Sequence, residues 1–211
     1  MPNWCYNTLI IEAEPQVIAK IKAQLSAPYE DKYQDFKSDT WITQTVQKDF
    51  SFWNIIRPPA DKMDEYHSAK GWSDGKSYGD TEYNWYNWNT SNWGVKWDAS
   101  DPELVEEDET SLQYRFNTPW GVAEEAMNTL SAQYPEVEFC LSFEEETGWG
   151  GELLFTEGSS IIINEFAQKC YACDKQWQHG EEYWDEYDDD TGQHKCEANG
   201  SAIEDKEKAN V

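Results

Sequence analysis

Four residues in the last quarter of the chain have the types and spacing of metal ligands. Two residues separate Cys170 from Cys173, and twenty residues lie between Cys173 and the His194-Lys195-Cys196 segment. Two thiolates at this spacing can bind one tetrahedral zinc ion, and a returning histidine and cysteine can complete it. We therefore predict a structural zinc ion bound by Cys170, Cys173, His194 and Cys196. His179 is an alternative to His194, and the competing interpretation is a segment with three unrelated cysteines.

The other short motifs lack the partners that their chemistry needs. A thioredoxin-like role for Cys170 and Cys173 is disfavoured, because no βαβ pattern follows and acidic neighbours raise a thiol pKa. The acidic run at Asp188–Gly192 has its glycine at the wrong position for a calcium-binding EF-hand loop. The chain has three histidines, and they suggest neither a Ser–His–Asp nor a Cys–His arrangement. We therefore predict a protein that is not an enzyme.

Tryptophan and asparagine residues are concentrated near the middle of the chain. Side chains of this size usually fill the space beside a sheet, and we favour this core interpretation. The alternative is an exposed platform for a small ligand. The residues of that platform would be Trp85, Asn89, Asn92 and Trp93.

Acidic residues outnumber basic ones along the whole chain, with 42 against 16 and a net charge of −26. Residues 1–164 hold 29 acidic and 11 basic residues, so the excess is not confined to the C-terminal part. Such a surface repels phosphate backbones and anionic membranes, so we predict no direct binding to nucleic acid or membrane. The charge serves either solubility or attraction to a partner with a basic surface. The candidate contact residues are Glu103, Glu106, Glu107, Asp108 and Glu109.

The composition favours a folded protein in a reducing compartment. Twelve Trp, 12 Tyr and 8 Phe residues predict a packed core. Aliphatic runs such as Ile161–Ile163 are too short to span a bilayer, and the first residues do not resemble a secretory signal. Five cysteines are an odd number for a disulfide framework. We therefore expect a cytoplasmic protein.

Apolar periodicity predicts an α+β fold. The predicted elements are a strand at 5–12, a helix at 15–25, a strand at 50–56, a strand at 110–116, a helix at 118–130, a strand at 137–144 and two further strands at 152–155 and 160–164. Strand–helix–strand taken twice is the split βαβ arrangement of ferredoxin-like domains, in which helices cover one face of an antiparallel sheet. No iron–sulfur cluster follows from that topology.

Three regions follow from this pattern. Residues 1–164 form the predicted ferredoxin-like domain, with an insertion at about 57–109. The insertion holds a helix at 83–93 and an acidic connector at 100–109. Residues 165–211 are an acidic, cysteine-containing extension and a candidate zinc-binding module.

Several segments resemble the YubB-like proteins of phages and plasmids. The similar segments, which cover most of residues 1–164, are Met1–Leu9, Phe50–Ile56, Trp85-Tyr86, Asn92–Ala99, Phe116–Trp120 and Leu141–Glu145. The resemblance implies a ferredoxin-like domain and a phage or plasmid origin, and it implies no activity.

Together these observations predict a non-enzymatic accessory protein that binds a basic host protein in the host cytoplasm and inhibits a defence system. One specific form of this function is a nucleic-acid mimic that occupies a basic groove. The competing class is a small-ligand binder or an enzyme that uses the tryptophan platform.

Overall fold

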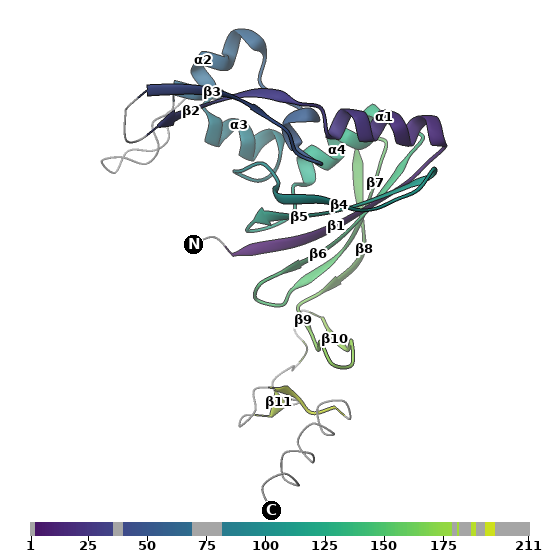
Figure 1. The fold of residues 1–211 in the computed structure, drawn as a ribbon. Coiled ribbons are helices and arrows are strands. Elements are labelled where there is room, and N and C mark those ends of the chain that lie inside the picture. The colour runs from purple at the N-terminus through teal and green to yellow at the C-terminus, as the bar shows by residue number, and fades with distance from the viewer. Residues whose placement is uncertain are drawn as a thin grey trace, which may run out of the picture.

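The centre of the molecule is a six-stranded antiparallel sheet with the strand order β4-β5-β1-β6-β7-β8 (Figure 1). The structure is a computed structural model and describes residues 3–35, 40–68, 82–178, 181, 187–188 and 193–196. The strands of the sheet are β1 (Trp4–Glu12), β4 (Ser100–Glu107), β5 (Ser111–Pro119), β6 (Glu138–Glu145), β7 (Gly150–Thr156) and β8 (Ser159–Phe166).

Two helices complete the predicted ferredoxin-like topology. Helix α1 (Pro15–Leu25) follows β1, and helix α4 (Glu124–Gln133) connects β5 to β6. Since β5 lies between β1 and β4, the order β1-α1-β4 followed by β5-α4-β6 is a split βαβ arrangement. The α+β, ferredoxin-like prediction is confirmed, and β7 and β8 extend the sheet beyond β6.

The core lies between this sheet and the two helices. Ile18, Ile21 and Leu25 are the buried residues of α1, at the spacing of one helical face. They pack in one cluster with the inward-facing residues of the sheet. The cluster includes residues of both helices and of the sheet, with Val17 partly buried against it: Leu9, Phe52, Leu112, Tyr114, Phe139, Leu141, Val17, Ile21, Leu25, Ala126, Met127 and Leu130.

The predicted second strand at Phe50–Ile56 is wrong. Phe52–Asn54 form a short 3₁₀ helix, η1, because the carboxylate of Asp98 accepts hydrogen bonds from the Phe52 N–H (2.7 Å) and the Ser51 hydroxyl (2.8 Å). Phe50 and Phe52 are both buried, so their alternation reflects a turn that places two rings in the core.

Strand β4 takes the place of the second strand, in a segment that was predicted to be a connector. It is an edge strand, so only one side of its backbone is paired within the sheet. Two register shifts relative to β5 and the presence of Pro102 disturb its alternation. A strand of this kind carries many charges and gives little periodic signal, which explains the error.

Several elements between α1 and β4 lie to one side of the sheet (Figure 1). They are the hairpin strands β2 (Tyr29–Asp35) and β3 (Thr40–Val46), the helices α2 (Met63–Ser68) and α3 (Trp85–Asn92), and the 3₁₀ helix η2 (Ala60–Lys62). The hairpin was not predicted, because four of the seven β2 residues are charged. Thr118 and Pro119 were also misassigned as a helix start, because they end β5, and α4 begins at Glu124.

The chain continues from β8 into two short hairpins below the sheet (Figure 1). The first pairs β9 (Gln168–Lys169) with β10 (Gln176–Trp177), and the second pairs β11 (Tyr187–Asp188) with β12 (Gln193–His194). Over the described parts of the chain, no helix has the length and apolar character needed to cross a membrane.

Candidate metal centre

The turn between β9 and β10 positions the first two cysteines. The Cys170 N–H donates to the Lys175 carbonyl, and the Asp174 N–H donates to the Cys170 carbonyl, each at 2.8 Å. Asp174 has a φ of +58°, in the left-handed region that aspartate tolerates better than most residues. This closed turn brings both thiols of the Cys-x-x-Cys pair to one place.

The second pair of ligands comes from the end of the β11–β12 hairpin. His194 is the last residue of β12, where it pairs with Tyr187. The Cys196 N–H donates to the His194 carbonyl at 2.9 Å, so the chain turns back within two residues. This turn explains how a His-x-Cys spacing, tighter than usual, can direct both side chains to the same point.

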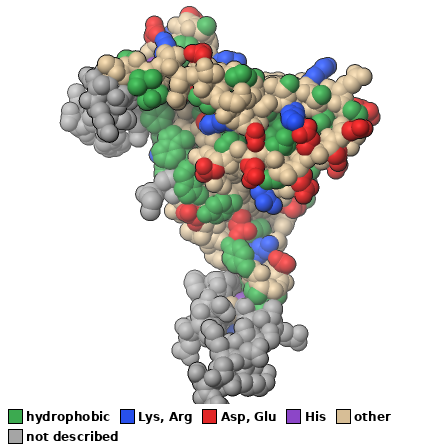
Figure 2. All heavy atoms as spheres, viewed as in Figure 1, with side chains coloured by type: hydrophobic (Ala, Val, Ile, Leu, Met, Phe, Trp, Pro, Cys, Tyr) green, Lys and Arg blue, Asp and Glu red, His purple; other side chains and the backbone are tan. Residues whose placement is uncertain are grey.

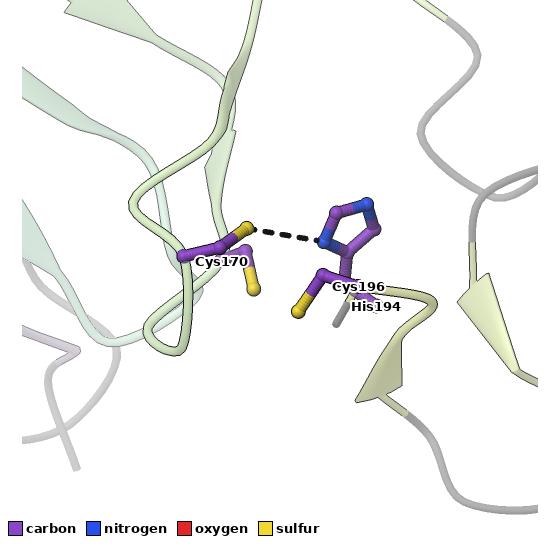
Figure 3. Close-up of side chains that lie close together, drawn as sticks. Cys170, His194 and Cys196 are labelled. Carbon is purple, nitrogen blue, oxygen red and sulfur yellow. Dashed lines mark hydrogen bonds between the residues drawn. The ribbon is translucent and has the colours of Figure 1, made fainter. Parts of the chain in front are cut away.

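The four predicted ligands meet in space. One sulfur each from Cys170, Cys173 and Cys196 and one ring nitrogen of His194 all lie within 4.8 Å of one another. The Cys173 Sγ is 3.5 Å from the His194 Nδ1, and Figure 3 shows the side chains converging. A tetrahedral ion with metal–sulfur bonds of about 2.3 Å separates its ligand atoms by roughly 3.8 Å. The group could therefore hold a metal ion after a small contraction.

Hydrogen bonds prepare one thiol for ionisation. Desolvation raises the pKa of Cys170. Hydrogen bonds from the N–H groups of Ala172 and Cys173 and from the ring of His194 outweigh that effect and bring the pKa down to about 7. The N–H of Lys175 lowers the pKa of Cys173, but burial and the adjacent thiols outweigh it, so this pKa is raised. Thiols that crowd together in this way favour a cation that neutralises them.

The surroundings of the group are partly apolar. Cys170 and His194 are each 7% exposed, whereas Cys173 is exposed. The ring of Trp177, which is buried, packs edge-on against the His194 ring with centroids 4.8 Å apart. Trp177 therefore restricts the orientation of the imidazole, a role that the sequence analysis did not assign.

Contacts with the sheet hold the β9–β10 hairpin in place. The Gln168 side chain donates to the Thr147 carbonyl, in the turn between β6 and β7, at 2.9 Å. The Ala167 N–H, directly after β8, donates to the Trp177 carbonyl at 2.7 Å. The Tyr171 hydroxyl also donates to the Glu144 carboxylate. The cysteine-bearing turn is thus hydrogen-bonded to β6 and to the turn between β6 and β7.

The other cysteines lie away from this group. Cys5 is fully buried in β1, where desolvation raises its thiol pKa to about 12. Cys140 lies in β6, and burial together with Glu152 raises its pKa as well. Neither thiol is poised to ionise near neutral pH, whereas Cys170 of the metal-binding group has a lowered pKa. His179, the alternative ligand, lies outside the described residues.

The tryptophan and asparagine residues do not form an open platform. Trp93 is buried, and its ring N–H donates to the Ile56 carbonyl at 3.0 Å. Asn89 is buried between the Tyr66 hydroxyl (2.9 Å) and the Lys96 carbonyl (2.8 Å). Trp85 is partly buried against the core, and the Asn92 amide donates to the Trp88 carbonyl. These residues support the fold, as the favoured interpretation expected.

The five acidic candidate residues are all exposed, although three of them lie in a strand. Glu103, Glu106 and Glu107 belong to β4, and Asp108 and Glu109 form the turn that leads to β5. The predicted connector at 100–109 is therefore wrong for Glu103, Glu106 and Glu107, whose exposure follows from the edge position of β4. Asp108 and Glu109 are exposed in the turn.

The comparisons with known proteins concern the fold. Residues 92–207, more than half of the chain, match the family model described as the ferredoxin-like domain in Api92-like protein. The chain belongs to this family. The crystal structure of a protein api92 from Yersinia pseudotuberculosis is similar over 86% of this chain and 100% of that chain, with 10% identity and a TM-score of 0.48. No curated protein matches the chain.

The span that matches the Api92-like family includes all four ligands of the candidate metal centre. It also continues past residue 164, where the sequence predicts the end of the ferredoxin-like domain. The division of the chain at this residue remains a prediction.

Proposed function

We propose that this chain is a non-enzymatic accessory protein of a phage or plasmid, and that it binds a host protein with a basic surface. In that setting the bound protein would belong to a host defence system, which the binding inhibits. The observation that carries the proposal is the acidic edge, defined as Glu103, Glu106, Glu107, Asp108 and Glu109. This edge places exposed carboxylates along β4 and in the turn that follows it.

The acidic edge faces a groove beside helix α1. The groove has a volume of about 490 Å³, and its α1 side combines the apolar Pro15, Ile18, Ala19 and Ala23 with Lys22 and the adjoining Ser26. Glu107, Asp108 and Glu109 line the other wall. The apolar wall suits the aliphatic stem of a lysine or arginine, and the carboxylates suit its charged end.

Charge at this end of the molecule is mainly negative. Figure 2 shows acidic side chains gathered at the right-hand end of the visible face, where α1 begins and β4 turns into β5. The Lys22 ammonium contacts the Glu107 carboxylate at 2.5 Å, so one cation is already bound there. An exposed ion pair of this kind contributes little and is easily exchanged for a partner's cation.

A nucleic-acid mimic is a specific form of the same proposal. A row of carboxylates on an edge strand can replace phosphates in a basic groove, and such a protein competes with nucleic acid without binding it. A small-ligand or enzymatic function of the tryptophan platform has less support, because Trp93 and Asn89 are buried.

We also propose that the metal is zinc and that its role is structural. Three thiolates and one imidazole are a donor set that zinc prefers. Four protein ligands leave no open position for water or substrate, so the ion would crosslink the two C-terminal hairpins.

The proposal predicts that partner binding weakens when the acidic edge is reversed. The host partner is first captured from a bacterial lysate and purified. Replacing Glu106 and Glu107 by lysine should then weaken binding at least tenfold, because like charges replace opposite ones at the contact. Raising salt from about 0.05 M to about 0.5 M should weaken wild-type binding and have less effect on the variant.

A matched control separates local contact from total charge. Glu136→Lys with Glu138→Lys makes the same change in net charge, on exposed residues near the start of β6. Equal losses in both variants would mean that only total charge matters. Unchanged affinity and unchanged salt dependence in the Glu106/Glu107 variant would leave solubility as the role of these acids. A labelled duplex should not bind to either protein.

A further inference from the structure

The two edges of the central sheet differ in a way that points to self-association. Strand β4, at one edge, is protected by carboxylates, by Pro102 and by two register shifts. Strand β8, at the other edge, carries Ile161, Ile162 and Ile163, which are 54%, 63% and 57% exposed. Three adjacent exposed isoleucines are unusual, because exposed apolar edge strands invite pairing with another chain.

Strand β8 retains unpaired backbone on its outer side. It is the terminal strand of the sheet, and among the described residues it pairs with β7 alone. Its single register shift lies at Ile163, since Glu152 pairs with Asn164 and Leu153 pairs with Ile162. The stretch from Ser159 to Ile162 is therefore regular, and the extra residue Ile163 is the one irregularity in the pairing of β8 with β7.

Charge identifies the partner of this edge. Residues 159–163 carry no charge in a chain with a net charge of −26. This stretch offers no carboxylate to the basic protein that the proposed function requires. An uncharged apolar strand fits best, and β8 itself has that character. We propose that β8 pairs with β8 of a second copy, in antiparallel orientation, to form a homodimer with a continuous sheet.

The positions of the flanking acids favour one register. Pairing centred on Ile162 places Ile161 opposite the second copy's Ile163, and Ser159 opposite its Glu165. Pairing centred on Ile161 would bring Glu157, in the turn just before β8, level with Glu165 of the second copy, and like charges at that position are destabilising. The register centred on Ile162 therefore brings the isoleucines of the two copies into cross-strand pairs and does not place these carboxylates level with one another.

The experiment is sedimentation equilibrium of the full chain at increasing concentrations. We expect the mass to rise from 24.6 kDa to twice that value, with a dissociation constant on the order of 10 µM because a single-strand interface is small. Ile162→Lys should remain monomeric, and Ile161→Lys is a second variant with the same expectation. Ile10→Lys is the matched control, because Ile10 is an exposed isoleucine on central strand β1; this variant should still dimerise.

Salt distinguishes this interaction from binding to a basic partner. Two chains of equal negative charge repel each other, so the dimer should tighten as salt rises, whereas partner binding should weaken. A wild-type chain that stays monomeric up to about 1 mM, or dimers unaffected by both lysine variants, would overturn the proposal. Dimers that appear only after residues 197–211 are removed would also overturn it, because the chain's own tail would then block the edge.

Discussion

Replacing Cys173 by serine is expected to reduce bound zinc from about one ion per chain to nearly none. A serine hydroxyl does not ionise at neutral pH and is a poor zinc ligand, so three ligands would remain. Cys173 is exposed, and its side chain contributes little to packing, so the main effect should be on the metal. Elemental analysis after dialysis against a weak chelator measures the result.

The control for this substitution is Cys140→Ser. Cys140 is a cysteine of the sheet that lies outside the metal-binding group, so its loss should leave the zinc content unchanged. Cys196→Ser should behave like Cys173→Ser. A wild-type protein without stoichiometric zinc, or a Cys173→Ser variant that keeps it, would refute the metal site.

The pKa of Cys170 gives the direction of the pH dependence. This pKa is about 7, below the ordinary thiol value of 9. The unfolded chain therefore binds more protons than the folded chain between pH 9 and pH 7, and the stabilising contribution of this thiolate is lost as pH falls through that window. Bound zinc competes with protons for the same sulfur, so the sulfur stays deprotonated to a lower pH when zinc is bound. Zinc retention should thus fall as pH decreases from about 8 to about 5.

The metal-binding group could be predicted from the sequence because ligand chemistry is carried by few residue types at short spacing. Cys170 and Cys173 define one half within a single turn, and the structure places His194 and Cys196 beside them. The role of Trp177 could not be predicted in this way. Its contact with His194 depends on how two separate hairpins pack, and no local spacing encodes that packing.

The strands at the centre of the sheet were predictable for a similar reason. Strands β1, β5 and β6 alternate between buried and partly or fully exposed residues over most of their length, because one face meets the helices. Strand β4 lacks this signal, since an edge strand is half solvated and its register shifts interrupt the period. Phe50 and Phe52 gave the opposite error, because two aromatic rings entering the core from a turn mimic a strand.

Truncating Phe116 to alanine is expected to lower the free energy of unfolding by about 3–5 kcal/mol. Phe116 is 2% exposed, and its ring stacks on Phe50 with centroids 4.6 Å apart and planes at 6°. The Phe116 and Phe52 rings are nearly perpendicular, with centroids 5.7 Å apart and planes at 86°. The substitution would leave a cavity where β5 meets η1. Phe52 is not paired in a strand, so the packing of its ring against Phe116 is what joins η1 to β5. Urea unfolding of the zinc-loaded protein, followed by circular dichroism, measures the change.

Tyr6→Ala is the matched control, because Tyr6 lies on neighbouring strand β1 and is 51% exposed. A surface truncation of this kind should cost about 0.5 kcal/mol. Phe116→Leu should fall between the two, since it keeps most of the buried volume. Domains of this size are stable by roughly 5–15 kcal/mol, so the alanine variant should lose a large part of its stability. A cost below about 1 kcal/mol would mean that η1 does not pack on β5 as described, because a ring enclosed by Phe50 and Phe52 cannot be removed without leaving a cavity.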